Sequence, residues 1–172
     1  LCLADNTRLD PANSHGHVNH GAALQMSGQT EEAVEGCRRA ITIDPGLADA
    51  HTNLGIALRD MNRFAEAEEA LGAALRLSPA DARVTVSLGT VVQARGRSDE
   101  AIELFDRALV LTPGHADTIY KRGLSYFHKG DFNEQALIDY EMRWRSDTFP
   151  SKWRDFPQPP WRGEELEGKR IL

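Results

Sequence analysis

Residues 48–81 read ADAHTNLGIALRDMNRFAEAEEALGAALRLSPAD, and the pattern of this stretch decides the fold. Leu54 and Leu58 are four residues apart in its first half, and Ala67 and Leu71 are four residues apart in its second half. Residues four apart lie on the same face of an α-helix. The stretch therefore predicts two helices that pack against each other through small and apolar side chains.

The same spacing continues on both sides of this stretch with a step of 34 residues. Prolines and glycines form two ladders, at Pro11, Pro45, Pro79 and Pro113 and at Gly21, Gly55, Gly89 and Gly123. Two alanine ladders keep the same step, at Ala33, Ala67 and Ala101 and at Ala40, Ala74 and Ala108. A period near 34 residues is typical of helix–turn–helix repeats. We therefore predict a solenoid of stacked helical hairpins.

Each repeated position has a physical reason in such a hairpin. Glycine in the first helix and alanine in the second helix let the two helices approach closely. Between the helices the chain has to turn back, at four equivalent positions occupied by Gly28, Asn62, Gly96 and Gly130. Glycine and asparagine are the residues that best tolerate the left-handed conformation that ends a helix. The periodic prolines follow the second helix and prevent it from continuing.

This pattern resembles the tetratricopeptide repeat family. The second repeat shows the small and apolar positions of that family best, at Leu54, Gly55, Leu58, Ala67, Leu71, Ala74 and Pro79. The resemblance implies an all-α fold, a right-handed α-solenoid of helical hairpins. It also implies an interaction scaffold that binds an extended peptide or a partner protein in the concave groove of the superhelix.

The 34-residue register divides the chain into repeats. The predicted divisions are 1–13 for the end of a truncated preceding repeat, 14–47, 48–81 and 82–115 for three regular repeats, 116–145 for a divergent terminal repeat, and 146–172 for an extended linker rich in proline and tryptophan. In the terminal repeat, the small residue expected at Gln135 comes one place later, at Ala136. The half repeat and the absence of an initiator methionine at Leu1 indicate a fragment with more repeats upstream.

The composition indicates a soluble globular protein, with 41% hydrophobic and 27% charged residues and a formal net charge of −6. Acidic and basic residues are mixed along the chain, so neither nucleic acid nor a membrane is an expected partner. Cys2 and Cys37 are the only cysteines, and no apolar run has the length of a membrane span. We therefore expect a cytoplasmic protein.

The groove is expected to be lined by first-helix positions that face away from the second helix. The candidate peptide-binding residues are His15, Asn19, Gln25, Asp49, Asn53, Arg59, Arg83, Ser87, Gln93, Tyr120, Lys121 and Phe127. Asn19 and Asn53 occupy one repeat position and are followed there by Ser87 and Lys121. They resemble the start of the asparagine ladder that holds a peptide backbone in the O-linked N-acetylglucosamine transferase family. The alternative is that asparagine is a tolerated polar residue on an exposed helix face.

No arrangement of residues indicates catalysis, a cofactor or a bound metal. His15, His17 and His20 are close in sequence, but no carboxylate or thiolate is evident in the same turns, so structural or surface roles are favoured over metal binding. Cys37 replaces the usual phenylalanine of the second helix and is expected to be a small buried thiol. We therefore do not expect this chain to be an enzyme by itself.

The composition changes abruptly near the carboxyl terminus, since all three tryptophans and four of the eight prolines fall from Trp144 onward. The stretches 140–144, 155–161 and 166–172 resemble a junction in bacterial tetratricopeptide repeat proteins, where the array joins a glycosyltransferase-like domain of the heptosyltransferase type. This resemblance implies an alternative function as the substrate-recruiting arm of a bacterial glycosyltransferase. The other interpretation is a capping extension packed on the last repeat. Self-association through the exposed tail or the truncated repeat is a further expectation.

Overall fold

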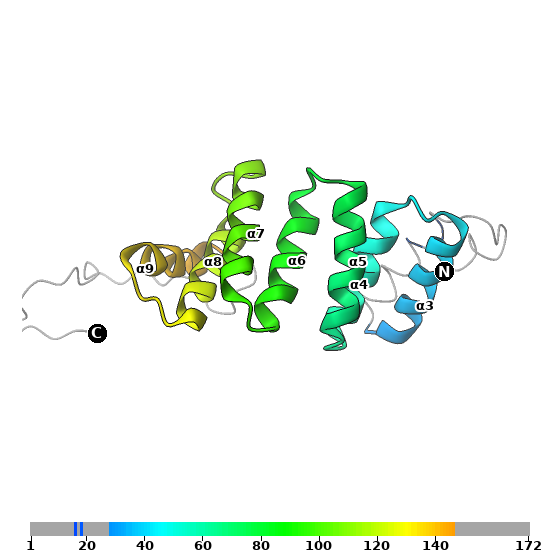
Figure 1. Ribbon diagram of the computed structural model, residues 1–172, viewed down its shortest axis with the longest axis horizontal. Coiled ribbons are helices and arrows are strands. Elements are labelled where there is room, and N and C mark those ends of the chain that lie inside the picture. Colours follow the sequence, from blue (N-terminus) through cyan, green and yellow to red (C-terminus); the bar gives the residue numbers. More distant parts are fainter. Residues whose placement is uncertain (1–15, 17, 19–27, 147–172) are drawn as a thin grey trace, which may run out of the picture.

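The computed structural model describes residues 16, 18 and 28–146, and these residues form helices joined by short turns (Figure 1). In chain order from residue 28, the described elements are α3 (Thr30–Ile43), α4 (Ala48–Asp60), α5 (Phe64–Leu77), α6 (Ala82–Ala94), α7 (Ser98–Leu111), α8 (Ala116–Lys129), α9 (Glu134–Glu141) and the short 3₁₀-helix η1 (Met142–Arg145). The predicted all-α fold class is confirmed. The predicted segment 1–13, most of residues 14–27, and residues 147–172 of the predicted linker 146–172 lie outside the described residues.

The helices form hairpins that stand side by side along the longest axis of the molecule (Figure 1). Within a hairpin, α4 packs on α5, α6 on α7 and α8 on α9, and each hairpin continues onto the next through α5 with α6 and α7 with α8. Each helix therefore packs mainly against its neighbours in the sequence. This arrangement is the stack of hairpins that the 34-residue period predicts.

The core of each hairpin is built from the repeated small residues and a few large apolar side chains. Among the fully buried small residues are Ala33, Ala67, Ala101, Ala40, Ala74 and Ala108, each no more than 1% exposed. A β-carbon added at Gly55 would lie 2.5 Å from the Leu71 side chain, and one at Gly89 would lie 2.8 Å from Phe105. The two glycines are therefore required for the close helix crossings. Cys37 is fully buried, as predicted from its repeat position.

The turn inside each hairpin has the backbone conformation that the sequence predicts. The φ angles are +79° at Gly28, +58° at Asn62, +78° at Gly96 and +82° at Gly130. Asn62 is the one described residue other than glycine with a positive φ. Asparagine is among the few residues with a side chain that adopt this left-handed conformation at a modest energetic cost.

The fourth hairpin differs from the others at its second helix. Helix α9 has eight residues, whereas α3, α5 and α7 have fourteen each. Its N-terminus is capped by the Asn133 side chain, which accepts a hydrogen bond of 2.8 Å from the Ala136 amide. Ala136 is fully buried and Gln135 is exposed, so the core alanine does come one place later than in the earlier repeats.

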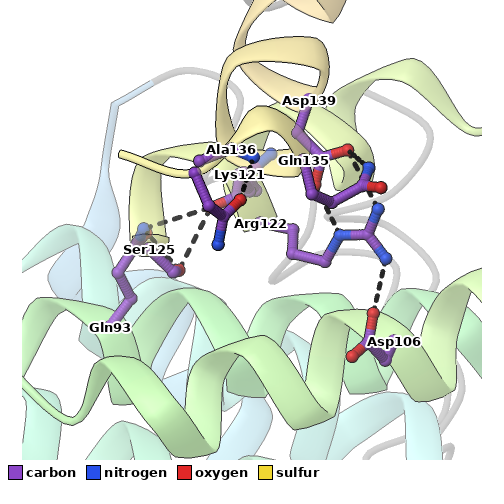
Figure 2. Close-up of polar contacts among 9 residues, drawn as sticks. Gln93, Asp106, Lys121, Arg122, Ser125, Gln135, Ala136 and Asp139 are labelled. Atoms are coloured by element: carbon purple, nitrogen blue, oxygen red, sulfur yellow. Dashed lines mark hydrogen bonds and ion pairs between the residues drawn. The ribbon is translucent and has the colours of Figure 1, made fainter. Parts of the chain in front are cut away.

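A charged pair joins α8 to α9 inside this last hairpin (Figure 2). The Asp139 carboxylate is 1% exposed and accepts hydrogen bonds from Arg122 Nε at 2.6 Å, Arg122 Nη2 at 2.9 Å and Gln135 Nε2 at 2.7 Å. Arg122 Nη1 also donates to Asp106 of α7 at 2.5 Å. The hydrogen bonds to Asp139 and Asp106 raise the pKa of the Arg122 guanidinium above its ordinary value, so Arg122 stays charged.

No helix in the described part of the chain is both long enough and apolar enough to cross a membrane.

Candidate peptide-binding groove

The first helices of the hairpins lie closer together than the second helices. Helix α4 approaches α6 and α6 approaches α8, whereas the backbones of α5 and α7 do not come into contact anywhere in the described residues. A stack whose first helices are closer than its second helices curves toward the first helices. The face lined by α4, α6 and α8 is therefore concave, and this face carries the candidate groove.

Nine of the twelve predicted groove residues are in the described part of the chain. They lie on α4 (Asp49, Asn53, Arg59), on α6 (Arg83, Ser87, Gln93) and on α8 (Tyr120, Lys121, Phe127). The other three, His15, Asn19 and Gln25, lie outside the described residues. The asparagine position of the first repeat is therefore not placed, and the second repeat contributes Asn53.

An ion pair links neighbouring hairpins at one edge of the groove. Arg83 Nη2 lies 2.8 Å from Asp49 Oδ1, so the pair connects the first turn of α6 to the first turn of α4. Both side chains are more than half exposed, so the pair contributes little to stability. In the candidate groove, the charge of Arg83 is therefore already paired with the charge of Asp49.

A second link between hairpins uses the predicted residue Gln93 (Figure 2). Its amide nitrogen donates to Ser125 Oγ at 2.9 Å and lies 3.3 Å from the Lys121 carbonyl oxygen on α8. Ser87 is buried, and its hydroxyl donates to the Arg83 carbonyl oxygen at 2.8 Å. The polar groups of Gln93 and Ser87 therefore serve contacts within the array.

Two predicted residues have a polar side-chain group without a hydrogen bond among the described residues. The side-chain amide of Asn53 and the ammonium group of Lys121 are partly exposed, and neither has a hydrogen-bond partner in the described part of the chain. Burial lowers the pKa of Lys121, Asp117 acts in the opposite direction, and the positive charge of Arg59 lowers it further. Arg59 itself is held by Asp60, with 2.7 Å between Nη2 and Oδ1.

The predicted aromatic residues of α8 contact the last helix. The ring centroids of Tyr120 and Tyr140 are 5.8 Å apart, and those of Phe127 and Tyr140 are 5.0 Å apart. Phe127 also stacks on Phe132 at 5.2 Å, and the Arg143 guanidinium lies 4.3 Å from the centre of the Tyr140 ring. Tyr120 and Phe127 therefore close the carboxyl-terminal end of the groove by packing on α9.

The roles of Tyr140 and Arg143 were not predicted, although a signal for them was present. The stretch 140–144 replaces the alanine and proline of the earlier repeats with aromatic and basic residues. This departure marks the end of the regular array, but it does not say which first-helix rings the new side chains contact.

The described residues contain neither a metal-binding cluster nor a reactive thiol. No group of three or more histidine, cysteine, aspartate or glutamate side chains there is arranged to hold a metal ion. Burial raises the pKa of the Cys37 thiol to about 11, so the side chain is protonated at neutral pH and is not a nucleophile.

The described helices form a stack of hairpins whose first helices line one concave face. Residues 52–116 match the model of the tetratricopeptide repeat family, a span that includes most of α4 and all of α5, α6 and α7. No curated protein matches the sequence.

Several solved structures have the same fold. A crystal structure of MamA shares 25% sequence identity with a TM-score of 0.73, and the match covers 81% of this chain and 81% of that chain. A structure of PilF from Pseudomonas aeruginosa shares 23% identity with a TM-score of 0.72, covering 81% of this chain and 64% of that one. An O-GlcNAc transferase from Thermobaculum terrenum shares 22% identity with a TM-score of 0.70, covering 79% of this chain and 26% of that chain.

Proposed function

We propose that this chain is a scaffold that holds an extended segment of a partner protein along α4, α6 and α8. The observation that carries the proposal is a pair of polar groups on the concave face, the amide of Asn53 and the ammonium of Lys121, that have no hydrogen-bond partner among the described residues. Both groups are partly exposed on the concave face, so a bound segment can reach them and form hydrogen bonds with them.

The chemistry of these two groups favours a peptide. A side-chain amide has both a donor and an acceptor, and so it matches the N–H and C=O groups of a peptide unit. The Lys121 ammonium can donate to a carbonyl oxygen or a carboxylate, and its partial burial strengthens such a contact. The ligand that fits best is therefore an extended segment with an acidic side chain near α8.

Binding of a single peptide to matched variants tests this proposal. The probe is a peptide selected by display on the purified chain, titrated against the wild type, Asn53→Ala and Lys121→Met. Each variant removes one hydrogen-bonding group, so we expect the affinity to fall about tenfold in each. Arg39→Ala, which removes an exposed cation from the second-helix side of α3, is the control and should bind normally. Unchanged affinity in both groove variants would contradict the proposal that the peptide binds along α4, α6 and α8.

A second candidate function is recruitment of substrates for a glycosyltransferase. The supporting observation is the similarity to the O-GlcNAc transferase, in which the matching region makes up 26% of a longer chain. The stretches 155–161 and 166–172, which resemble a junction to such a domain, lie outside the described residues. Incubating the purified chain with nucleotide sugars and candidate acceptors should give background turnover only. The same assay on the longest natural form of the protein would then show whether the array recruits acceptors to a transferase.

A further inference from the structure

A second concave site lies on the opposite side of the array, between the second helices α5 and α7. It is a cleft of about 640 Å³. Its floor is apolar and consists of Leu88 and Val92 from α6 and Leu104 from α7. The groove of the proposed function uses the first helices, so this cleft is a separate surface.

The cleft is open because α5 has a glycine where its neighbour has an arginine. Arg38 of α3 stands 34 residues before Gly72, and its guanidinium reaches across to Glu66 of α5 at 3.4 Å. Gly72 has no side chain to make the equivalent contact with α7. A β-carbon at Gly72 would meet one atom, Arg76 Nη1, at an ordinary contact distance of 3.6 Å. Packing therefore does not require glycine at this position, and the missing side chain leaves the space open.

Arginines stand at both ends of the apolar floor. At one end, Arg95 and Arg97 both pair with Glu68. At the other end, Arg76 and Arg107 are exposed and have no ion-pair partner in the described part of the chain. Eight residues separate Glu68 from Arg76 along α5, which corresponds to about 12 Å of helix.

Carboxylates also line the walls of this cleft. Glu100 is held by Arg97, with 2.5 Å between its Oε2 and Nη2. Glu69 and Glu103 face the cleft without an ion pair among the described residues. A ligand that brings an acidic group must therefore place it at the Arg76 and Arg107 end, because the arginines at the other end are already paired with Glu68 and Glu100.

Helix α9 presents a face with the complementary order of side chains. Glu134, Leu137, Ile138 and Glu141 are spaced i, i+3, i+4 and i+7, so they form one stripe along the helix. Leu137 and Ile138 are each 54% exposed, while Ala136 and Asp139 on the other face are buried. Glu134 has no ion pair in the described part of the chain, whereas Glu141 already contacts Arg143 Nη1 at 2.9 Å and accepts a hydrogen bond from Trp144 Nε1 at 3.2 Å.

We propose that α9 of one copy of this chain docks in the α5–α7 cleft of a second copy. Leu137 and Ile138 then cover Leu88, Val92 and Leu104, and Glu134 meets the unpaired Arg76 and Arg107 at one end of the cleft. The contact joins two different surfaces, so it is heterologous. Repeated from copy to copy, it produces open linear assemblies whose length grows with concentration.

Light scattering and sedimentation of the full 172-residue chain over a concentration series test the proposal. The wild type should show a mean mass that rises with concentration. Gly72→Arg fills the cleft at a position with room for a side chain and should leave the protein monomeric. Gly72→Ala leaves the cleft open and should assemble like the wild type. Val110→Asp on α7 replaces another exposed apolar residue, 81% exposed, and should also assemble.

The Ile138→Asp variant tests the α9 face. It is used only if its circular dichroism spectrum and melting temperature match those of the wild type. Ile138→Asp should be monomeric alone, and so should Gly72→Arg. A mixture of the two should form 1:1 dimers and nothing larger, because each variant keeps the surface that the other has lost.

Exchanging charges between the cleft and α9 tests which side chains meet, without altering the apolar residues of the contact. Arg76→Glu with Arg107→Glu should weaken assembly, and Glu134→Arg added to that double variant should restore it in part. A 172-residue chain that remains monomeric at all concentrations would overturn the proposal. Assembly that persists in Gly72→Arg would overturn it as well.

Discussion

Arg122 and Asp139 form an ion pair at a place where the two preceding hairpins have an apolar contact. Arg122 stands one 34-residue step after Leu88, and Asp139 stands one step after Phe105. A β-carbon added at Gly123 would lie 2.9 Å from Asp139 Cβ, as one at Gly89 would lie 2.8 Å from the Phe105 ring. The repeat geometry is thus preserved while its chemistry changes from apolar packing to a charged, directional pair.

The first prediction follows from this pair. Arg122→Leu leaves the Asp139 carboxylate buried without its cation, and we expect a loss of about 3 kcal/mol in the free energy of unfolding. Arg122→Leu with Asp139→Leu restores the apolar pairing of the second and third repeats and should recover most of that loss. Urea unfolding of the two variants and the wild type measures both changes. A double variant that is no more stable than Arg122→Leu would contradict this account.

Two glycines at helix interiors should respond to the same substitution with opposite signs. Gly89→Ala places a β-carbon 2.8 Å from Phe105, so it should destabilise the protein by about 1 to 3 kcal/mol. Gly72→Ala meets one atom at 3.6 Å and gains helix propensity, so it should stabilise the protein by about 0.5 to 1 kcal/mol. Gly89→Leu should be more damaging than Gly89→Ala, and Glu103→Gln on the exposed side of α7 should be nearly neutral. Melting temperatures that do not separate the two alanine variants would count against the repeat register.

The difference between Gly89 and Gly72 shows why the sequence predicts the fold so well. Glycine recurs at Gly55 and Gly89 because the two helices of the hairpin lie too close there for a larger side chain. A steric requirement of this kind repeats in the sequence with the period of the hairpins. Helix positions, left-handed turns and the late core alanine at Ala136 follow from that periodicity. Contacts that form once leave no periodic pattern, and for this reason the Arg122–Asp139 pair had to be found in three dimensions.

The helices that carry the candidate groove could be predicted from the sequence, but the contacts of the side chains on them could not. First-helix positions follow from the period, and Asn53 and Lys121 lie on the expected helices. Whether a polar side chain is open to a ligand depends on its neighbours in the next hairpin. Gln93 is engaged with Ser125, and Tyr120 packs on Tyr140, because α8 and α9 supply partners that spacing alone does not reveal.

Asn62 provides a test of the turn conformation. Its φ of +58° strains any residue with a β-carbon, and asparagine tolerates it better than alanine does. Asn62→Ala should therefore destabilise the protein by about 1 kcal/mol, while Asn62→Gly should keep or slightly raise its stability. Thermal unfolding distinguishes the two outcomes. Equal losses in both variants would mean that the asparagine side chain, and not its backbone angle, is what matters here.

The last prediction concerns the buried thiol of Cys37. Burial raises its pKa from 9.0 to about 11 in the folded protein, so the unfolded chain releases this proton at a lower pH than the folded one does. The unfolded state then binds fewer protons between these pH values, and the free energy of unfolding falls as the pH rises. The stabilisation is complete below pH 9 and is lost progressively up to about pH 11.

Because lysines and tyrosines titrate over the same range, the measurement has to be a difference between the wild type and Cys37→Ala. We expect the stability gap between them to narrow by about 2 to 3 kcal/mol from pH 8 to pH 11. In the folded wild type at pH 8, alkylation by iodoacetamide should be slow and should accelerate with urea as the chain opens. Rapid alkylation under native conditions, or a stability gap independent of pH, would show that the thiol is not shielded in the seam between the helices.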